Sequence, residues 1–223
     1  MSRQKNCLIL GATGMVGSEV LTHLLSDHRI NHVTSIVRRN TEVHHPKLTE
    51  IIHDNFYDFS SFDSVLQSID LIYYCLGVYQ TKVSSRDFWA ITVGIQDALL
   101  SMIEKSHPNI TFCLLSAQGA DPTEKSPLLF AKAKGRAEQH LSKANIKTYY
   151  IFRPGYIHPY QNKHKNWSTK LFAPLYFLYP SIGIDAQALG QVIANTGMEG
   201  HRQPILYHKD IRESAAIHRA NNT

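Results

Sequence analysis

The sequence has few cysteines and no long apolar run. Its three cysteines, Cys7, Cys75 and Cys113, each lie in a short apolar segment. An odd number of such cysteines argues against a disulfide framework, so we expect free thiols in the core of a protein from a reducing compartment. A membrane span needs about 18 consecutive apolar residues, and none is present, so we expect no transmembrane segment. The first strand is expected within a few residues of Met1, which leaves no room for a targeting peptide and favours the cytoplasm.

Clustered charge and metal motifs are also missing. Lysine and arginine number 23 against 18 aspartates and glutamates, a net charge of +5, but the basic residues are scattered. Without a basic stripe we expect no nucleic-acid partner. Of the 13 histidines, His44 and His45 are adjacent and therefore point apart, and no His-Glu-x-x-His motif occurs. We expect no metal site.

What is present is a regular alternation of apolar strands and amphipathic helices. With 223 residues, 43% of them hydrophobic, the chain suits a single domain over residues 1–223. The pattern predicts an α/β fold, a doubly wound, mostly parallel Rossmann sheet with helices on both faces. Six strands are expected at Cys7–Leu10, His32–Val37, Leu48–Ile52, Leu71–Leu76, Ile110–Leu115 and Lys147–Phe152.

Helices are expected between these strands. The clearest runs from Arg86 to Lys105, and another should open at Ser126 and Pro127, a capping hydroxyl followed by proline. Further helices are expected at 17–25, 60–68 and 185–198, and a seventh strand at 204–207. The polar tail that ends at Thr223 is expected to be frayed.

The first strand leads into a glycine loop. It reads Gly11, Ala12, Thr13, Gly14, Met15, Val16, Gly17. A strand that ends in glycine and continues as a helix gathers backbone N–H groups at the positive end of the helix, where a pyrophosphate can bind. Gly11 permits the tight turn, Gly14 lets phosphates approach, and Gly17 lets the helix pack on the sheet. The loop predicts a dinucleotide site.

Two arginines favour NADP(H) as the cofactor. Arg38 and Arg39 follow the second strand, where NAD-binding proteins carry an acidic residue for the ribose hydroxyl. Guanidinium groups there suit a 2′-phosphate. A solvated pair of arginines is the plainer alternative. Asp54, after the third strand, is expected either at the adenine edge or as a turn cap.

The sequence resembles an atypical, NAD(P)-binding member of the short-chain dehydrogenase/reductase superfamily. Within it, the sequence is similar to the NmrA-like NAD(P)H-binding group that includes the Tat-interacting protein. The resemblance covers about the first 160 residues and rests on these segments in the family's order: the glycine loop, Val37–Arg39, Cys75–Gly77, Leu115–Ala120, Lys134–Glu138 and Phe152–Gly155.

The resemblance implies roles for several positions. Ser116 would bind the substrate carbonyl, and Lys134 would hold the nicotinamide ribose. The family's proton-donating tyrosine, four residues before the lysine, is Phe130 here. Water, Tyr79 or Tyr156 could replace it, or the substrate could need no protein acid. The remaining cofactor contacts that the resemblance implies are Leu76, Gly77, Pro154 and Gly155.

Two functions follow. The first is an NADP(H)-dependent oxidoreductase that reduces a small carbonyl or conjugated substrate with Ser116 and Lys134. The alternative is a non-catalytic NADP(H)-binding regulatory or interaction protein, which Phe130 favours. Residues 156–203 are expected to form a substrate lid and C-terminal subregion, in which 163–179 could instead contact a membrane or partner. A homodimer through the helix from Arg86, or a protein partner, stays open.

Overall fold

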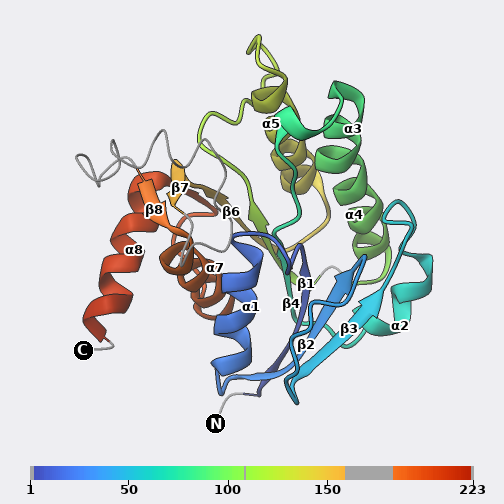
Figure 1. Ribbon diagram of the computed structural model, residues 1–223, viewed down its shortest axis with the longest axis vertical. Helices are drawn as coiled ribbons and strands as arrows, with labels where there is room; N and C mark the ends of the chain where they lie inside the picture. The colour runs from blue at the N-terminus through green and yellow to red at the C-terminus, as the bar shows by residue number, and fades with distance from the viewer. Residues whose placement is uncertain (1–2, 108, 159–182, 222–223) are drawn as a thin grey trace.

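The alternation of strands and helices predicted from the sequence is confirmed by the structure, a computed structural model (Figure 1). It describes residues 3–107, 109–158 and 183–221. The strands are β1 (Lys5–Leu10), β2 (Ile30–Val37), β3 (Leu48–Ile52), β4 (Leu71–Tyr74), β5 (Thr111–Leu115), β6 (Thr148–Arg153), β7 (Tyr156–His158), β8 (Gly183–Asp185) and β9 (Ile205–Tyr207).

Helices follow most of these strands. The α-helices are α1 (Gly17–Ser26), α2 (Asp63–Leu66), α3 (Ser85–Trp89), α4 (Ile95–Ser106), α5 (Leu129–Lys143), α7 (Ala186–Glu199) and α8 (His208–Asn221). Short 3₁₀ turns lie at Ser60–Phe62 and Gln80–Lys82, and a π-helical turn at Ala90–Gly94 joins α3 to α4. The predicted helix over Arg86–Lys105 is therefore one path with a π-bulge inside it.

Seven strands form one parallel sheet in the order β3-β2-β1-β4-β5-β6-β9. The chain runs outward from β1 to β3 and then crosses to β4 on the other side of β1. That reversal creates a switch point at the carboxyl ends of β1 and β4, where ligands of doubly wound sheets bind. The predicted Rossmann fold is confirmed, and β7 pairs with β8 in a separate parallel ribbon.

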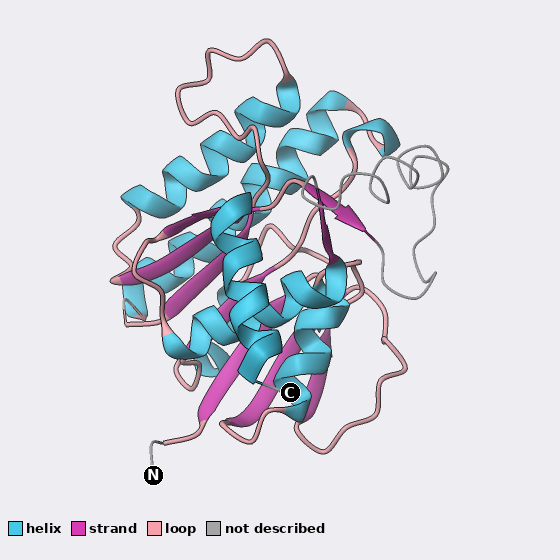
Figure 2. Ribbon diagram, turned by 90° about the vertical axis from the view of Figure 1, so that its left-hand side faces the viewer, coloured by secondary structure: helices cyan, strands magenta, loops and turns pink. Residues whose placement is uncertain are grey.

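Alternate residues of the central strands pack against opposite helix layers, which Figure 2 shows on the two faces of the sheet. On β1, Cys7 and Ile9 join the core beneath α1 and α7, while Leu8 and Leu10 join the core beneath α2, α4 and α5. All four are fully buried. All three cysteines are buried and free, as small core residues. Among the residues that the structure describes, no helix is long and apolar enough to cross a membrane.

Several element boundaries differ from the sequence prediction, most of all the start of α5. The helix expected from Ser126 begins at Leu129, because the carboxylate of Asp121 accepts the Ser126 N–H (2.7 Å) and the Ser126 hydroxyl accepts the Leu128 N–H (3.2 Å). These bonds hold the segment in a turn. The strand expected to reach Leu76 ends at Tyr74. The small β7–β8 ribbon was not predicted.

The expectation of a frayed tail was wrong for most of its length. Residues 208–221 form the helix α8, which buries Ile211 and Ala215 against the core beneath α7. Among the described residues, Ile211 and Ala215 are the two side chains that anchor this helix in the core, so its sequence carries little helical periodicity. The polar composition of this segment therefore gave no indication that it forms a helix packed on the core.

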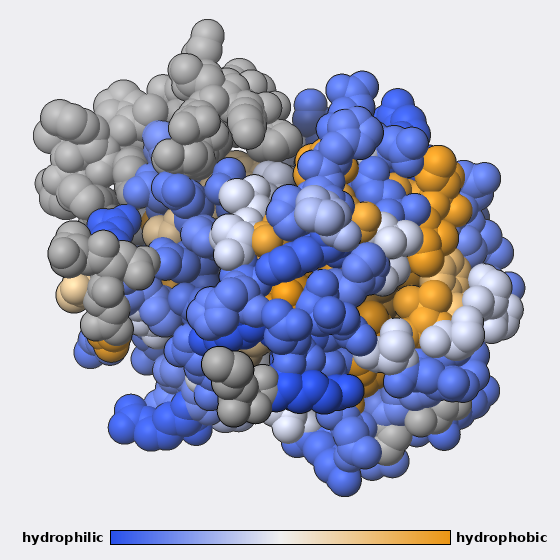
Figure 3. Space-filling model, turned by 90° about the horizontal axis from the view of Figure 1, so that it is seen from below, coloured by the Kyte–Doolittle hydropathy of each residue, from blue (hydrophilic) through white to orange (hydrophobic). Residues whose placement is uncertain are grey.

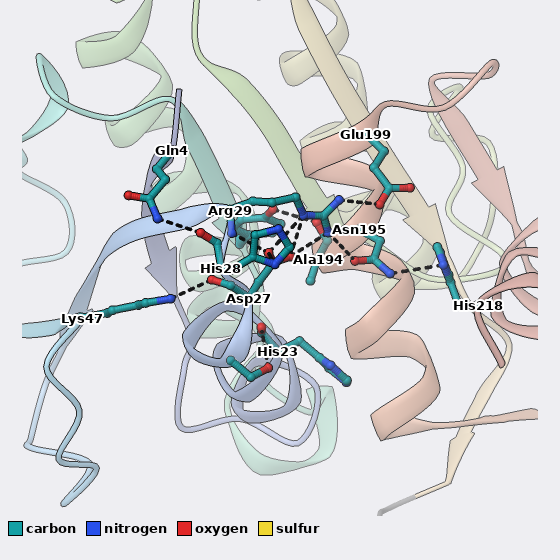
Figure 4. Close-up of polar contacts among 12 residues, drawn as sticks. Gln4, His23, Asp27, His28, Arg29, Lys47, Ala194, Asn195, Glu199 and His218 are labelled. Atoms are coloured by element: carbon teal, nitrogen blue, oxygen red, sulfur yellow. Dashed lines mark hydrogen bonds and ion pairs between the residues drawn. The ribbon is translucent and has the colours of Figure 1, made fainter. Parts of the chain in front are cut away.

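The amino edge of the sheet is held by a polar network (Figure 4). Arg29 donates to Asp27, to Glu199 of α7 (2.6 Å) and to Asn195 of α7 (3.2 Å). Burial alone would raise the pKa of Asp27, but the hydrogen bonds from Arg29 outweigh it and lower that pKa. The pocket beside this network, of about 530 Å³, lies at the edge opposite the switch point.

From below, the surface is mostly hydrophilic (Figure 3). Hydrophobic atoms gather toward the side on which α2 and α4 lie in Figure 1. Polar side chains therefore dominate the part of this face that the view shows.

We predict that Gly190→Ala destabilises the fold. A Cβ on Gly190 would lie 2.6 Å from Cβ of Glu19 and 2.9 Å from the Val20 nitrogen, so α1 and α7 would have to separate. Overpacking of this kind costs about 1–3 kcal/mol, measured by urea unfolding. Gly94→Ala is the control, because its Cβ would meet only the ring of the exposed Tyr57, at 3.3 Å. Equal losses in the two variants would contradict the prediction.

Candidate active site

The glycine loop has the geometry that the sequence predicts. Gly11 adopts φ +85°, and a Cβ there would lie 2.6 Å from the backbone of Cys75 and Leu76. The Gly14 N–H donates to the Gly11 carbonyl (2.9 Å), and a Cβ on Gly17 would lie 2.1 Å from that oxygen. The loop thus lies against the chain that leaves β4, and only glycine fits at both ends.

Helix α1 begins directly from this loop. Val16 occupies its N-cap position, and no side chain caps the first turn. Uncapped N–H groups at a helix N-terminus are suited to an anion. Ala12 and Val16 are buried, whereas Thr13 is exposed. The loop can therefore accept a pyrophosphate, and the individual contacts of Ala12, Thr13 and Met15 stay predictions.

Arg38, Arg39 and Asp54 follow two neighbouring strands, β2 and β3, at the carboxyl edge of the sheet. The His53 N–H donates to the Val37 carbonyl (2.9 Å), which keeps the ends of β2 and β3 paired. Both arginines and Asp54 are exposed. Within the described ranges neither guanidinium forms an ion pair, so both remain available to a phosphate.

Lys134 projects from α5 to the ends of β4 and β5. Its Nζ donates to the Leu115 carbonyl (3.2 Å) and lies 4.0 Å from the position of a Cβ on Gly77. Burial of the ammonium lowers the pKa of Lys134 to about 8, although the negative charge of Glu138 opposes the shift. A lysine that titrates near neutral pH in a sheet crevice is a functional candidate.

Ser116 belongs to a buried network that the sequence did not predict. Its hydroxyl donates to the carboxylate of Glu138, which is 2% exposed. Arg153 donates to the same carboxylate through Nε (2.9 and 3.1 Å) and through a terminal nitrogen. The Arg153 guanidinium lies over the Tyr207 ring, 5.3 Å from its centroid. The only sequence signal was that Glu138 and Arg153 belong to two of the motifs behind the family resemblance.

The ring of Phe130, at the position of the family's tyrosine, lies in an apolar cluster. It packs against Phe88 of α3, with centroids 6.4 Å apart, in a cluster with Val93 and Ala133. Tyr79 is exposed, and burial raises the pKa of Tyr156, with the neighbouring Tyr79 adding to the shift. This geometry does not assign the role of proton donor to Tyr79 or to Tyr156.

The last predicted contacts lie where β4 and β6 end. Leu76 is half-buried and Gly77 exposed, while Pro154 is buried beside the half-buried Gly155. The Gly155 N–H donates to Nδ1 of His208, the first residue of α8 (3.1 Å). The sequence gave no sign of this contact, because the tail was expected to fray.

The predicted lid falls largely outside the described residues. Residues 163–179, expected as a lid or as a membrane or partner surface, lie entirely within 159–182, which the structure does not describe. From 156–203, the described part consists of β7, β8, α7 and the turn after α7. In the described ranges no three His, Cys, Asp or Glu side chains gather as metal ligands.

The fold and the glycine loop define a Rossmann-type protein. A family model described as "NAD dependent epimerase/dehydratase family" matches residues 7–135, more than half of the chain. The chain belongs to this family, and its resemblance to atypical short-chain dehydrogenases is confirmed.

Two curated relatives are similar to the chain. Protein HTATIP2 of Rattus norvegicus is 28% identical over 160 residues, 70% of this chain and 64% of that protein. Protein fmp52 of Aspergillus niger, named as mitochondrial, is 28% identical over 160 residues, 68% of this chain and 66% of that protein. The chain thus spans just under two thirds of these relatives. The cytoplasmic location stays a prediction.

Solved structures share the fold at low identity. The PhqB reductase domain of Penicillium fellutanum has a TM-score of 0.70 at 16% identity, covering 94% of this chain and 68% of that chain. WbmG of Bordetella bronchiseptica, solved with NAD, has 0.69 at 12%, covering 97% and 77%. Gre2 of Candida albicans, solved with NADPH, has 0.69 at 16%, covering 91% and 78%.

We predict that Glu138→Gln strongly destabilises the protein. The substitution leaves the buried Arg153 guanidinium without its counter-charge, and breaking a buried pair costs about 3–5 kcal/mol. Urea unfolding measures the loss. Glu124→Gln is the matched control, because Glu124 pairs with Arg136 at the surface of α5 and its loss should be much smaller. A Glu138→Gln variant as stable as the control would contradict the buried-pair interpretation.

Proposed function

We propose that the protein is an NADP(H)-binding oxidoreductase that reduces a small carbonyl or conjugated substrate. The observation that carries the proposal is the position of the Lys134 ammonium, partly desolvated at the ends of β4 and β5 beside the glycine loop. Bound NADPH would supply the hydride. Membership of an NAD-dependent family and the NAD and NADPH complexes among the structural neighbours support the cofactor class.

The cradle fits a dinucleotide. Side chains at Gly11 or Gly17 would collide with backbone, so the tight turn requires glycine at both positions, and the first turn of α1 that follows is uncapped. In the proposed complex the loop binds the pyrophosphate and Lys134 binds the nicotinamide ribose. Gly77, Pro154 and Gly155 border the nicotinamide. Ser116 lies at the end of β5 and orients the substrate.

The preference for NADP(H) rests on Arg38 and Arg39. Both side chains are exposed after the end of β2, and neither forms an ion pair within the described residues. A 2′-phosphate can accept bidentate bonds from a guanidinium.

A non-catalytic cofactor-binding regulator is the second candidate. Phe130 favours it, because the usual tyrosine is missing and the ring at this position packs against Phe88. A regulator of this kind would bind NADP(H) tightly and show no catalytic turnover with any substrate.

We predict that NADPH binds more tightly than NADH and that Arg38→Ala/Arg39→Ala removes this preference. Each lost charge-assisted hydrogen bond is worth about 1.5–3 kcal/mol, which corresponds to a loss of at least tenfold in NADPH affinity. Isothermal titration calorimetry measures both cofactors. NADH affinity in the same variant is the internal control and should stay constant. If neither dinucleotide binds, the glycine-loop interpretation fails.

We predict slow NADPH oxidation with part of a panel of aldehydes, ketones and conjugated enones. Lys134→Met should reduce kcat/KM by at least tenfold, because the ribose contact and the site's positive charge are lost. Lys132→Met, on the same helix, is the matched control and should retain the wild-type rate. Tight cofactor binding with background turnover on every substrate would instead support the regulator.

A further inference from the structure

A carbonyl reduction needs a proton as well as a hydride, and the usual donor is absent. Position 130, where the resemblance implies a tyrosine, carries a phenylalanine whose ring lies in the apolar cluster with Phe88, Val93 and Ala133. The proton must come from another group at the ends of β4, β5 and β6, or from water.

Ser116 is not free to give its proton. The hydroxyl proton is donated to Glu138, whose two carboxylate oxygens also accept from Arg153. Since Ser116 has one O–H, a substrate oxygen could take it only if the bond to Glu138 broke. Arg153 is an equally poor donor, because a guanidinium keeps its proton and its pKa is raised further by the hydrogen bonds to Glu138.

Lys134 has N–H protons that take no part in the hydrogen bonds among Ser116, Glu138 and Arg153. An ammonium carries three N–H groups, and one donates to the Leu115 carbonyl (3.2 Å). Gly77 faces this ammonium: a Cβ there would lie 4.0 Å from Nζ of Lys134, but glycine has no side chain to block approach.

The charges around Lys134 leave it without a hydrogen-bonded counter-ion in the described part of the chain. Glu138, one turn further along α5, is matched by Arg153. Cys75, which follows β4, is a neutral thiol because burial raises its pKa to about 12. With burial lowering the pKa of Lys134 to about 8, both of its protonation states are reached near neutral pH, as acid catalysis requires.

We propose that Lys134 is the proton donor of the reduction, in the place that tyrosine holds in the superfamily. This inference rests on the proposed function. Lys134 transfers one N–H proton to the carbonyl oxygen while the carbonyl carbon receives the hydride from NADPH. The N–H bond breaks and the O–H bond forms, the carbonyl is reduced to an alcohol, and NADPH is oxidised to NADP⁺. The neutral amine regains its proton from water.

The first test is the pH dependence of kcat/KM with the best substrate of the carbonyl panel. Wild type should lose activity above about pH 8, tenfold per pH unit, because the neutral amine has no proton to give. Lys134→Arg keeps the positive charge but holds its proton. It should bind NADPH within a few-fold of wild type and lose about 10²–10⁴-fold in kcat/KM, with no descending limb near pH 8.

The second test needs no turnover. The rate at which acetic anhydride acetylates Lys134 in the cofactor-free protein is followed by mass spectrometry across pH 6–11, with N-acetyl-lysine amide as the standard. The Lys134 profile should have a midpoint near 8, well below that of the standard, and saturating NADPH should protect the residue.

The outcomes separate the two proposals. If the pH profile of kcat/KM in Lys134→Arg still falls above about pH 8, Lys134 is not the proton donor. That result overturns the inference and leaves the proposed function intact. A Lys134 profile that matches the standard also overturns the inference, whatever the turnover. NADPH binding with no reduction of any substrate overturns both proposals.

Discussion

The buried carboxylate of Glu138 is the constraint on which the carboxyl edge of the sheet depends. It is almost fully withdrawn from water, and an unpaired charge there would be very costly. Arg153 from β6 and Ser116 from β5 satisfy it. One side chain of α5 therefore joins two neighbouring strand ends to the helix that carries Lys134. Burial lowers the pKa of Lys134 to about 8, and within the described residues the carboxylate of Glu138, which opposes this shift, is ion-paired with Arg153 rather than with the lysine.

Most of the fold could be predicted because its signals are local. Short apolar runs followed by glycine, and the amphipathic faces of α1 and α4, determine the strand–helix alternation. The geometry of Gly11 and Gly17 was also readable, since a strand that turns directly into a helix needs residues without a Cβ at these points.

The parts that could not be predicted depend on contacts between distant segments. The bond between Ser116 and Glu138 joins residues 22 positions apart, and no periodicity encodes it. Helix α8 is stabilised by packing of Ile211 rather than by its own polar sequence. The start of α5 shifted because Asp121 competes for backbone N–H groups that a capping rule assigns to the helix.

The contact between His208 and Gly155 ties the last helix to the edge of the crevice. The Gly155 N–H donates to Nδ1 of His208, so the first residue of α8 accepts a hydrogen bond from the backbone that follows β6. A displacement of the C-terminal helix would therefore move the backbone at Gly155, although α8 itself follows β9 at the far edge of the sheet.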